Sequence, residues 1–206
     1  MLPEMRQKEA DIEGIAARAI EDDGLLAELL EGLKSKEETY RYNCHKVLMT
    51  VTETHAGLLY PSWDYFVEHL SGNNSYHKMS AVHLMANLVK VDTEDRFVRI
   101  LDKFYGLLDD RSMVVAYYVA QNSAKIIGAK PELENRIVGK LLAIDKTHHP
   151  SGRKELIKTG IIEAFDGLFD DTGVRPELID FVKQQLDSES NKTRKTAKAF
   201  LEKWSG

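Results

Sequence analysis

The sequence contains a single cysteine, Cys44, among its 206 residues. One cysteine excludes an intrachain disulfide, and with it the disulfide-stabilised scaffolds typical of small secreted proteins. Long hydrophobic runs are also lacking: the longest stretch without a charged residue covers residues 112–124, which is shorter than the ~18 apolar residues that a membrane-spanning helix needs. Residues 1–14 mix acidic and basic side chains without an apolar segment. We therefore expect no secretory signal, no membrane association and a cytoplasmic location.

Short motifs that mark catalytic or cofactor sites are absent as well. The sequence has no Gly-rich phosphate loop and no Gly-x-Ser-x-Gly elbow. None of its seven histidines lies three or four residues from another, which is the spacing that a helical metal site needs. His148 and His149, with Asp145 nearby, suggest at most an adventitious surface ion, and a solvated loop is the simpler interpretation. We expect no cofactor and no metal, and nothing specifies an enzyme.

The charge is acidic in total and uneven along the chain. A formal net charge of −5 disfavours a protein that coats nucleic acid, because such binding depends on a broad basic face. Residues 1–23 carry three bases and seven acids (3 − 7 = −4), whereas residues 190–206 carry five bases and one acid (5 − 1 = +4). Two solvated helix faces at the ends are the simpler interpretation. The alternative is a homo-oligomer in which these oppositely charged ends meet.

What the chain does have is helical periodicity. Cys44, Val47, Leu48 and Val51 follow the i, i+3, i+4, i+7 spacing that places apolar residues on one helix face. The same spacing recurs along most of the sequence, and no stretch alternates with period two. These patterns predict an all-α protein with about eleven helices and no strands.

An internal repeat organises these helices. The last apolar residue of each shorter first helix recurs at intervals of 36 to 42 residues. A residue that packs inward early in each second helix recurs at intervals of 37 to 40 residues, and a basic residue precedes it by three positions in four of five units. The three series are Leu33, Leu70, Leu108, Ile144 and Leu186; Cys44, Ala81, Ala120, Ile157 and Ala197; and Arg41, Lys78, Lys154 and Arg194.

This pattern resembles the HEAT/armadillo class of helical repeats over about residues 23–206. The resemblance implies a single domain, 1–206, built as a right-handed α-α superhelix, or α-solenoid, of about five helix pairs behind an N-terminal capping helix. In such a fold neighbouring pairs must stack, because no pair buries its apolar stripe alone. In the fourth repeat we expect a bend or break of the second helix at Gly160. The expected units are a capping helix at 1–22 and repeats at 23–59, 60–92, 93–129, 130–172 and 173–206.

Cys44 and His45 are neighbours, which raises the question of a catalytic dyad. Adjacent side chains on a helix diverge by about 100°, whereas a nucleophile and its base must come within hydrogen-bonding reach. Cys44 also occupies the packing position that alanine fills in three other repeats. We therefore expect a buried, unreactive thiol.

Trp63 and Asp64 superficially resemble the aromatic and acidic residues that HEAT-like-repeat DNA glycosylases of alkylation repair use. However, Trp63 lies on the apolar stripe of its helix, so we expect it in the core. Metal-binding HEAT-repeat hydroxylases use several His-Glu dipeptides, which this sequence lacks. Lyase activity on a chromophore, as in some HEAT-repeat proteins, has no motif here to support it.

The resemblance implies that the second helices line the concave side of the solenoid, where a partner would bind. Tyrosine is frequent in interfaces because it offers a large contact area and a hydroxyl group at low entropic cost. We predict a non-enzymatic interaction or scaffold module for a protein or peptide partner, with Tyr118, Gln121 and Lys125 as the first candidates. Packing between repeats is the alternative role for these side chains, and a nucleic-acid-binding or DNA alkylation-repair protein, dependent on Arg41, Lys78 and Lys154, is the alternative function. The predicted surface comprises Tyr42, His45, Lys46, His83, Tyr117, Tyr118, Gln121, Asn122 and Lys125.

Overall fold

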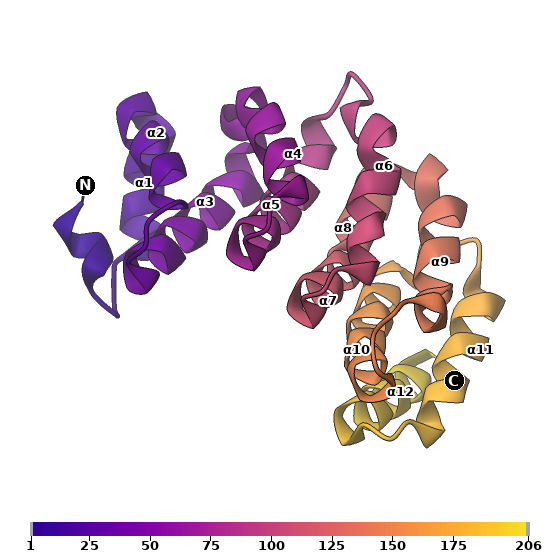
Figure 1. Ribbon diagram of the computed structural model, residues 1–206. Helices are drawn as coiled ribbons and strands as arrows, with labels where there is room; N and C mark the ends of the chain where they lie inside the picture. Colours follow the sequence, from indigo (N-terminus) through magenta and orange to yellow (C-terminus); the bar gives the residue numbers. More distant parts are fainter. Residues whose placement is uncertain (1, 205–206) are drawn as a thin grey trace. The chain divides into compact units, whose positions relative to one another are not determined.

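The computed structural model describes residues 2–204, and within them the chain is all-helical (Figure 1). Twelve α-helices and seven short 3-10 helices account for the secondary structure of these residues, which contain no strand. The prediction of an all-α protein is confirmed. None of the described helices combines the length and the apolarity that crossing a membrane requires.

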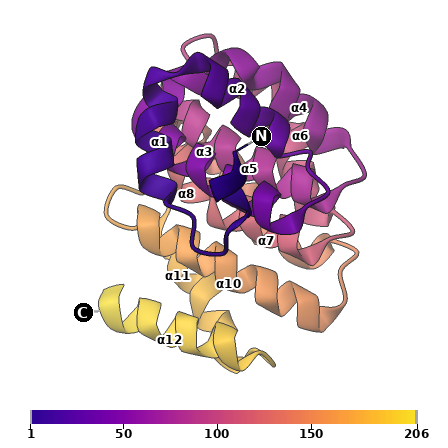
Figure 2. The same cartoon turned by 90° about the vertical axis from the view of Figure 1, so that its left-hand side faces the viewer.

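The chain divides into two compact units, one ending at Arg96 and the other starting at Phe97. In the first unit, α1 and α2 both pack against α3, as Figure 2 shows, and α3 and α4 pack against α5. In the second unit, α7 packs against α10, and α10 against α12. The first unit contains α1 (Ile12–Glu21), α2 (Asp23–Gly32), α3 (Glu38–Leu59), α4 (Trp63–Ser71) and α5 (Ser75–Leu88), and the helices that follow are α6 (Arg96–Gly106), α7 (Met113–Gln121), α8 (Ser123–Ala129), α9 (Glu134–Leu142), α10 (Ser151–Leu168), α11 (Arg175–Gln184) and α12 (Asn191–Trp204).

Contacts inside each unit repeat with the period seen in the sequence. In the first unit, Lys90 Nζ donates a hydrogen bond of 2.6 Å to the backbone oxygen of Glu53, 37 residues earlier. In the second unit, Thr193 Oγ1 donates a hydrogen bond of 2.7 Å to the backbone oxygen of Glu155, 38 residues earlier. These bonds show that α3 contacts the segment after α5, and that α10 contacts α12, at separations close to the predicted repeat length.

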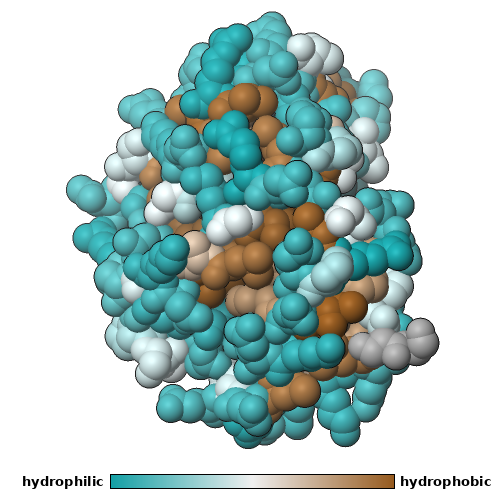
Figure 3. Space-filling view, turned by 90° about the vertical axis from the view of Figure 1, so that its right-hand side faces the viewer, coloured by the Kyte–Doolittle hydropathy of each residue, from teal (hydrophilic) through white to brown (hydrophobic). Residues whose placement is uncertain are grey.

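The inward positions of the repeat are buried as predicted. Cys44, Ala81, Ala120, Ile157 and Ala197 are all 0% exposed. Trp63 is 1% exposed, which confirms its place in the core. Hydrophilic residues dominate the face drawn in Figure 3, where apolar residues form interrupted strips.

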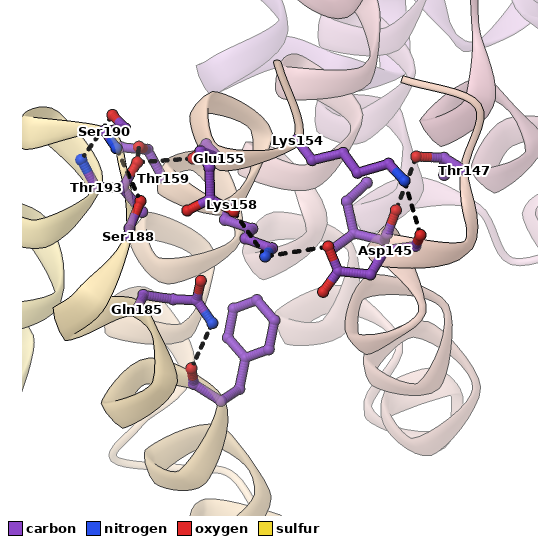
Figure 4. Close-up of polar contacts among 12 residues, drawn as sticks. Asp145, Thr147, Lys154, Glu155, Lys158, Thr159, Gln185, Ser188, Ser190 and Thr193 are labelled. Atoms are coloured by element: carbon purple, nitrogen blue, oxygen red, sulfur yellow. Dashed lines mark hydrogen bonds and ion pairs between the residues drawn. The ribbon is translucent and has the colours of Figure 1, made fainter. Parts of the chain in front are cut away.

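The series of apolar residues that end the first helices holds at four positions and fails at the fifth. Leu186 is 42% exposed, whereas its counterparts are buried. Leu108 and Ile144 also lie in 3-10 helices and are buried, so the winding alone does not expose Leu186; in the 3-10 helix Gln185–Asp187 the first residue faces inward. Gln185 takes the buried place, at 4% exposure, and its Nε2 donates to the backbone oxygen of Phe181 at 2.9 Å (Figure 4).

The recurring basic residues have a structural task. Arg41 donates to the backbone oxygen of Ser35 at 2.8 Å, and Lys154 donates to that of Asp145 at 2.8 Å. Arg194 donates in the same way to the backbone oxygen of Ser188. Carbonyl groups beyond a helix end lack intrahelical partners, so each base satisfies an oxygen in the turn between paired helices.

The predicted bend at Gly160 is wrong, because α10 runs without interruption from Ser151 to Leu168. A Cβ atom at Gly160 would lie 2.9 Å from the backbone oxygen of Tyr117, so the glycine permits close approach of α7 and α10. The interruption occurs at Asn122, between α7 and α8, where the Asn122 Nδ2 donates to the backbone oxygen of Tyr118 at 2.8 Å. Such a side-chain bond to the preceding turn competes with the helical ladder.

Candidate functional site

The first unit contains four of the predicted binding residues, and two of them form a histidine pair. His45 Nε2, from α3, lies 3.1 Å from His83 Nδ1, from α5, and the two rings stack with centroids 5.2 Å apart. His45 is only 7% exposed, so it belongs to the packing between the two helices. For this residue, the alternative of packing between repeats describes the structure better than an open binding surface.

Burial sets the chemistry of His45. Desolvation lowers the pKa of this imidazole from 6.5 to about 4, so the ring is neutral near pH 7. Its Nδ1 has no hydrogen-bond partner among the described residues. Buried N–H groups without an acceptor are rarer in proteins than buried acceptors without a donor, so we assign the proton to Nε2, which then donates to His83 Nδ1.

The other two predicted residues of the first unit lie on the surface of α3. Tyr42 is 56% exposed, and Lys46 Nζ lies 5.5 Å from the centroid of the Tyr42 ring. An exposed cation–π pair of this kind contributes about 0.5–1 kcal/mol. The pair offers an aromatic face and a charge, and it does not line the cavities of about 210, 230, 310 and 330 Å³.

The second unit brings together side chains from three successive second helices. Tyr117 and Gln121 are one turn apart on α7, and both donate to Glu163 Oε2 on α10, at 2.7 and 2.9 Å. Lys192 Nζ, on α12, lies 4.0 Å from Glu163 Oε1 and 5.1 Å from the centroid of the Tyr117 ring. Burial and the bond to Glu163 both raise the pKa of Tyr117, so its hydroxyl remains a donor at neutral pH. We refer to these four residues as the Tyr117–Glu163 network.

Two cavities flank this network. The first has a volume of about 210 Å³, and Val114 at its edge is 47% exposed. The second has a volume of about 230 Å³. Each combines apolar side chains with charged groups at the rim, which is the usual make-up of a site for a mixed apolar and polar ligand. The first is lined by Met113, Val114, Tyr117, Tyr118, Leu156 and Lys192, and the second by Ile162, Glu163, Asp166, Thr196, Ala199, Phe200 and Lys203; together they form the α7/α10/α12 surface.

The predicted residues of the second unit are only partly brought together. Tyr117, Tyr118 and Gln121 belong to the network or to the first cavity. Asn122 is 6% exposed, and its Nδ2 donates to the backbone of α7, so it is not available on the surface. Lys125 is exposed on α8, beyond the interruption after α7.

Sequence reasoning missed the contributions of α10 and α12. Leu156 and Glu163 lie seven residues apart, which places them on one face of α10. This spacing, visible in the sequence, could have indicated that both residues lie on the face of α10 that forms the site. Lys192 was considered only as part of the basic terminal segment.

The histidines near residue 148 are not a solvated loop throughout, because His149 is 2% exposed and its Nε2 lies 3.1 Å from the backbone oxygen of Leu108. His148 pairs with Asp109, at 2.5 Å, and the carboxylate of Asp145 pairs with Lys158. In the part of the chain that the structure describes, no group of three or more candidate ligands is arranged to hold a metal ion.

Comparison with known proteins supports the fold and nothing finer. No family model matches the chain, and no curated protein does. Among solved structures, the chain is similar to the crystal structure of an engineered protein, with 20% sequence identity and a TM-score of 0.52. The similarity covers 95% of this chain and 89% of the other.

Proposed function

We propose that this protein is a non-enzymatic interaction module that binds a peptide segment of a partner protein on the α7/α10/α12 surface. The observation that carries the proposal is the pair of cavities flanking the Tyr117–Glu163 network. Each cavity accepts one apolar side chain of the partner, while Glu163 and Lys192 between them present a carboxylate and an ammonium group to its polar backbone.

The proposal includes an α-solenoid of HEAT/armadillo type as the architecture. Hydrogen bonds between positions 37 and 38 residues apart support it in each unit separately. Second helices that pack on one another present a continuous series of side chains to a ligand. In this proposal the repeats at 23–59 and 60–92 each hold one helix pair, α2–α3 and α4–α5.

The nucleic-acid alternative has less support. Arg41 and Lys154, on which it depends, donate to backbone carbonyl groups of their own chain. Trp63, the aromatic residue that suggested a base-recognition site, is buried. The cavity of about 230 Å³ has Glu163 and Asp166 in its lining, which disfavours a phosphate backbone there.

Head-to-tail association of copies also loses support. Within the basic terminal segment, Lys203 Nζ lies 3.0 Å from Asp166, and Lys198 Nζ lies 3.7 Å from Glu202. With the contact of Lys192 to Glu163, three of the five bases of this segment lie near a carboxylate of the same chain. Sedimentation tests head-to-tail association, which requires an oligomer that forms at low salt and dissociates at high salt.

Val114→Asp tests peptide binding directly. Peptides are selected from a random library against the immobilised protein, and their affinities for wild-type and variant proteins are then measured. A carboxylate at the edge of the cavity of about 210 Å³ should weaken the selected peptides about tenfold or more. Leu186→Asp is the matched control, because Leu186 has similar exposure, 42% against 47%, and lines neither cavity. Equal affinity of both variants for the selected peptides, or a selection that yields no binder, would contradict the proposal.

A further inference from the structure

The segment that precedes α1 packs against α3 through a short 3-10 helix, Pro3–Arg6 (Figure 2). Among residues 2–10, Met5 is the one buried side chain, at 0% exposure. Its neighbours Pro3 and Arg6 are exposed. The segment is therefore attached to the first unit in the way that a short peptide ligand is, by a single apolar anchor.

Asn43, on α3, holds the backbone of this segment. Its Nδ2 donates to the backbone oxygens of Met5 and Gln7, at 2.8 Å each. Asn43 is 2% exposed, and both N–H donors of its amide group are directed at one short stretch of chain. Backbone oxygens are common to every peptide, so this contact recognises a peptide backbone whatever its side chains. Without a peptide in place the buried amide would lack acceptors, which is costly.

Two ion pairs flank the buried methionine. Glu4 Oε1 lies 3.2 Å from Arg18 Nη1 of α1, and Arg6 Nε lies 3.1 Å from Glu37 Oε2, at the start of α3. The four side chains are 39% to 58% exposed, so the pairs add little affinity. They do set a preference, because exchanged charges would face like charges. The site therefore favours an acidic residue before the apolar anchor and a basic residue after it.

A cavity extends the site beyond Leu2. The backbone N–H of Leu2 is in hydrogen-bonding contact with the Glu28 carboxylate and the Tyr40 hydroxyl. Glu28 and Tyr40 also line a cavity of about 330 Å³ next to α2, which has room for one further side chain. A peptide that follows the path of the segment therefore reaches this cavity. Its lining consists of Glu28, Glu31, Gly32, Lys34, Ser35 and Tyr40.

Residues 2–7, which we call the strap, are joined to α1 by an exposed connection. The side chains of Lys8 and Glu9 are exposed and make no hydrogen bond or ion pair with any residue from 2 to 204. Segments with few buried contacts open at a lower free energy than the core. Opening of the strap uncovers Asn43 and the place of Met5, so that another peptide can bind there.

The tether to α1 decides which peptide can replace the strap. A second copy of the chain offers the same contacts without the tether, and a short tether gives the strap an effective concentration in about the millimolar range. A second copy therefore does not displace the strap at micromolar concentrations. A partner peptide that also fills the cavity of about 330 Å³ gains contacts there, which offset the advantage of the tether.

We propose that α1, α3 and the adjoining cavity form a peptide-binding site, which the strap closes until a segment of a partner protein displaces it. The partner segment has an apolar residue between an acidic and a basic residue, and a bulky side chain at the end that meets Glu28. The site lies in the first unit and shares no residue with the α7/α10/α12 surface, so it is independent of the proposed function.

Met5→Asp in the full chain should open the site, because a carboxylate is costly in the buried place of Met5. The probe is an N-acetyl, C-amide peptide with the sequence of residues 2–9, and binding is followed through the amide resonances of α3 in two-dimensional NMR. We expect saturable binding to the variant and binding about tenfold or more weaker to wild type, in which the strap competes. Lys8→Asp is the matched control, since it adds the same carboxylate at an exposed position and should bind like wild type.

Two further changes test the recognised chemistry in the Met5→Asp background. Asn43→Leu should weaken the probe about tenfold or more, because both bonds to its backbone are lost. A probe with a tryptophan added before the position of Leu2 should bind about threefold to tenfold tighter, and a probe with its acidic and basic positions exchanged should bind more weakly. No saturable binding to a folded Met5→Asp variant, equal affinity of this variant and wild type, or no gain from the tryptophan would overturn the proposal.

Hydrogen exchange of the wild-type chain tests the strap without any substitution. The backbone N–H groups of Met5 and Gln7 donate to the backbone oxygens of Leu2 and Glu4. Through local opening they should exchange about a hundredfold faster than the N–H of Leu48 in the core of α3. Exchange at the rate of Leu48 would show that the segment leaves only on global unfolding, which contradicts a strap. A wild-type dimer in sedimentation that Met5→Asp does not form would make a second copy the occupant, and would equally refute a partner segment.

Discussion

Gly160→Ala tests the close contact between α7 and α10. The new Cβ atom would lie 2.9 Å from the backbone oxygen of Tyr117 and 3.2 Å from its ring. A backbone oxygen cannot rotate away, so the two helices must separate, and added volume in a packed core costs about 1–3 kcal/mol. Alanine also has a helix propensity about 1 kcal/mol more favourable than glycine, which acts in the opposite direction.

Gly139→Ala isolates the packing cost. Gly139 lies inside α9 of the same unit, is exposed, and has nothing within 4 Å of its ideal Cβ position. The propensity gain is common to both variants and cancels in their difference. We therefore expect Gly139→Ala to raise the free energy of unfolding by about 1 kcal/mol and Gly160→Ala to lie about 1–3 kcal/mol below Gly139→Ala. Urea denaturation followed by circular dichroism measures both, and equal stability of the two variants would refute the close contact.

Two further predictions concern buried groups of the first unit. Between pH 6.5 and about 4, His45 is protonated in the unfolded state but not in the folded state. The free energy of unfolding should therefore fall by up to about 3 kcal/mol as the pH drops through this window. His45→Gln should reduce this dependence on pH, which urea denaturation at several pH values measures. Burial also lowers the pKa of His69, His77 and His149, so these residues contribute to the same fall in stability. If the wild-type free energy of unfolding did not change with pH below 6.5, the lowered pKa of His45 would be contradicted. Burial raises the pKa of the Cys44 thiol to about 12, so a bulky thiol reagent should label it only after urea unfolding; Cys44→Ala should fold at a cost of about 1 kcal/mol.

The parts of the fold that follow from helical period were predictable. The inward positions, from Cys44 to Ala197, depend only on spacing along one helix and on the repeat. The prediction failed at Leu186 because the neighbouring Gln185, a polar residue that apolar periodicity does not select, takes the inward place after α11. Gly160 was read as a helix breaker, since a sequence does not reveal which backbone will press against a glycine from a neighbouring helix.

Only the α7 side of the candidate site was predictable, because its partner on α10 depends on the packing of the two helices. Tyr117 and Gln121 were predicted because they flank the small inward position, Ala120, of a second helix. Their common acceptor, Glu163, lies 46 residues from Tyr117, and only the packing of α10 against α7 brings them together. Local pattern indicates which side chains of a helix are polar and surface-directed, whereas their partners depend on the contact between helices.

α10 contributes residues to every cavity discussed for the second unit. Leu156 lines the first cavity of the α7/α10/α12 surface, Glu163 lines the second, and Glu155 lines a third cavity of about 310 Å³. The approach of α10 to α7 is limited at Gly160, between these positions, by contact with the backbone of Tyr117. A side chain at Gly160 should therefore separate Tyr117 from Glu163 and weaken the hydrogen bond between them. The glycine that was predicted to interrupt the repeat instead sets the distance between α7 and α10, on which the Tyr117–Glu163 network depends.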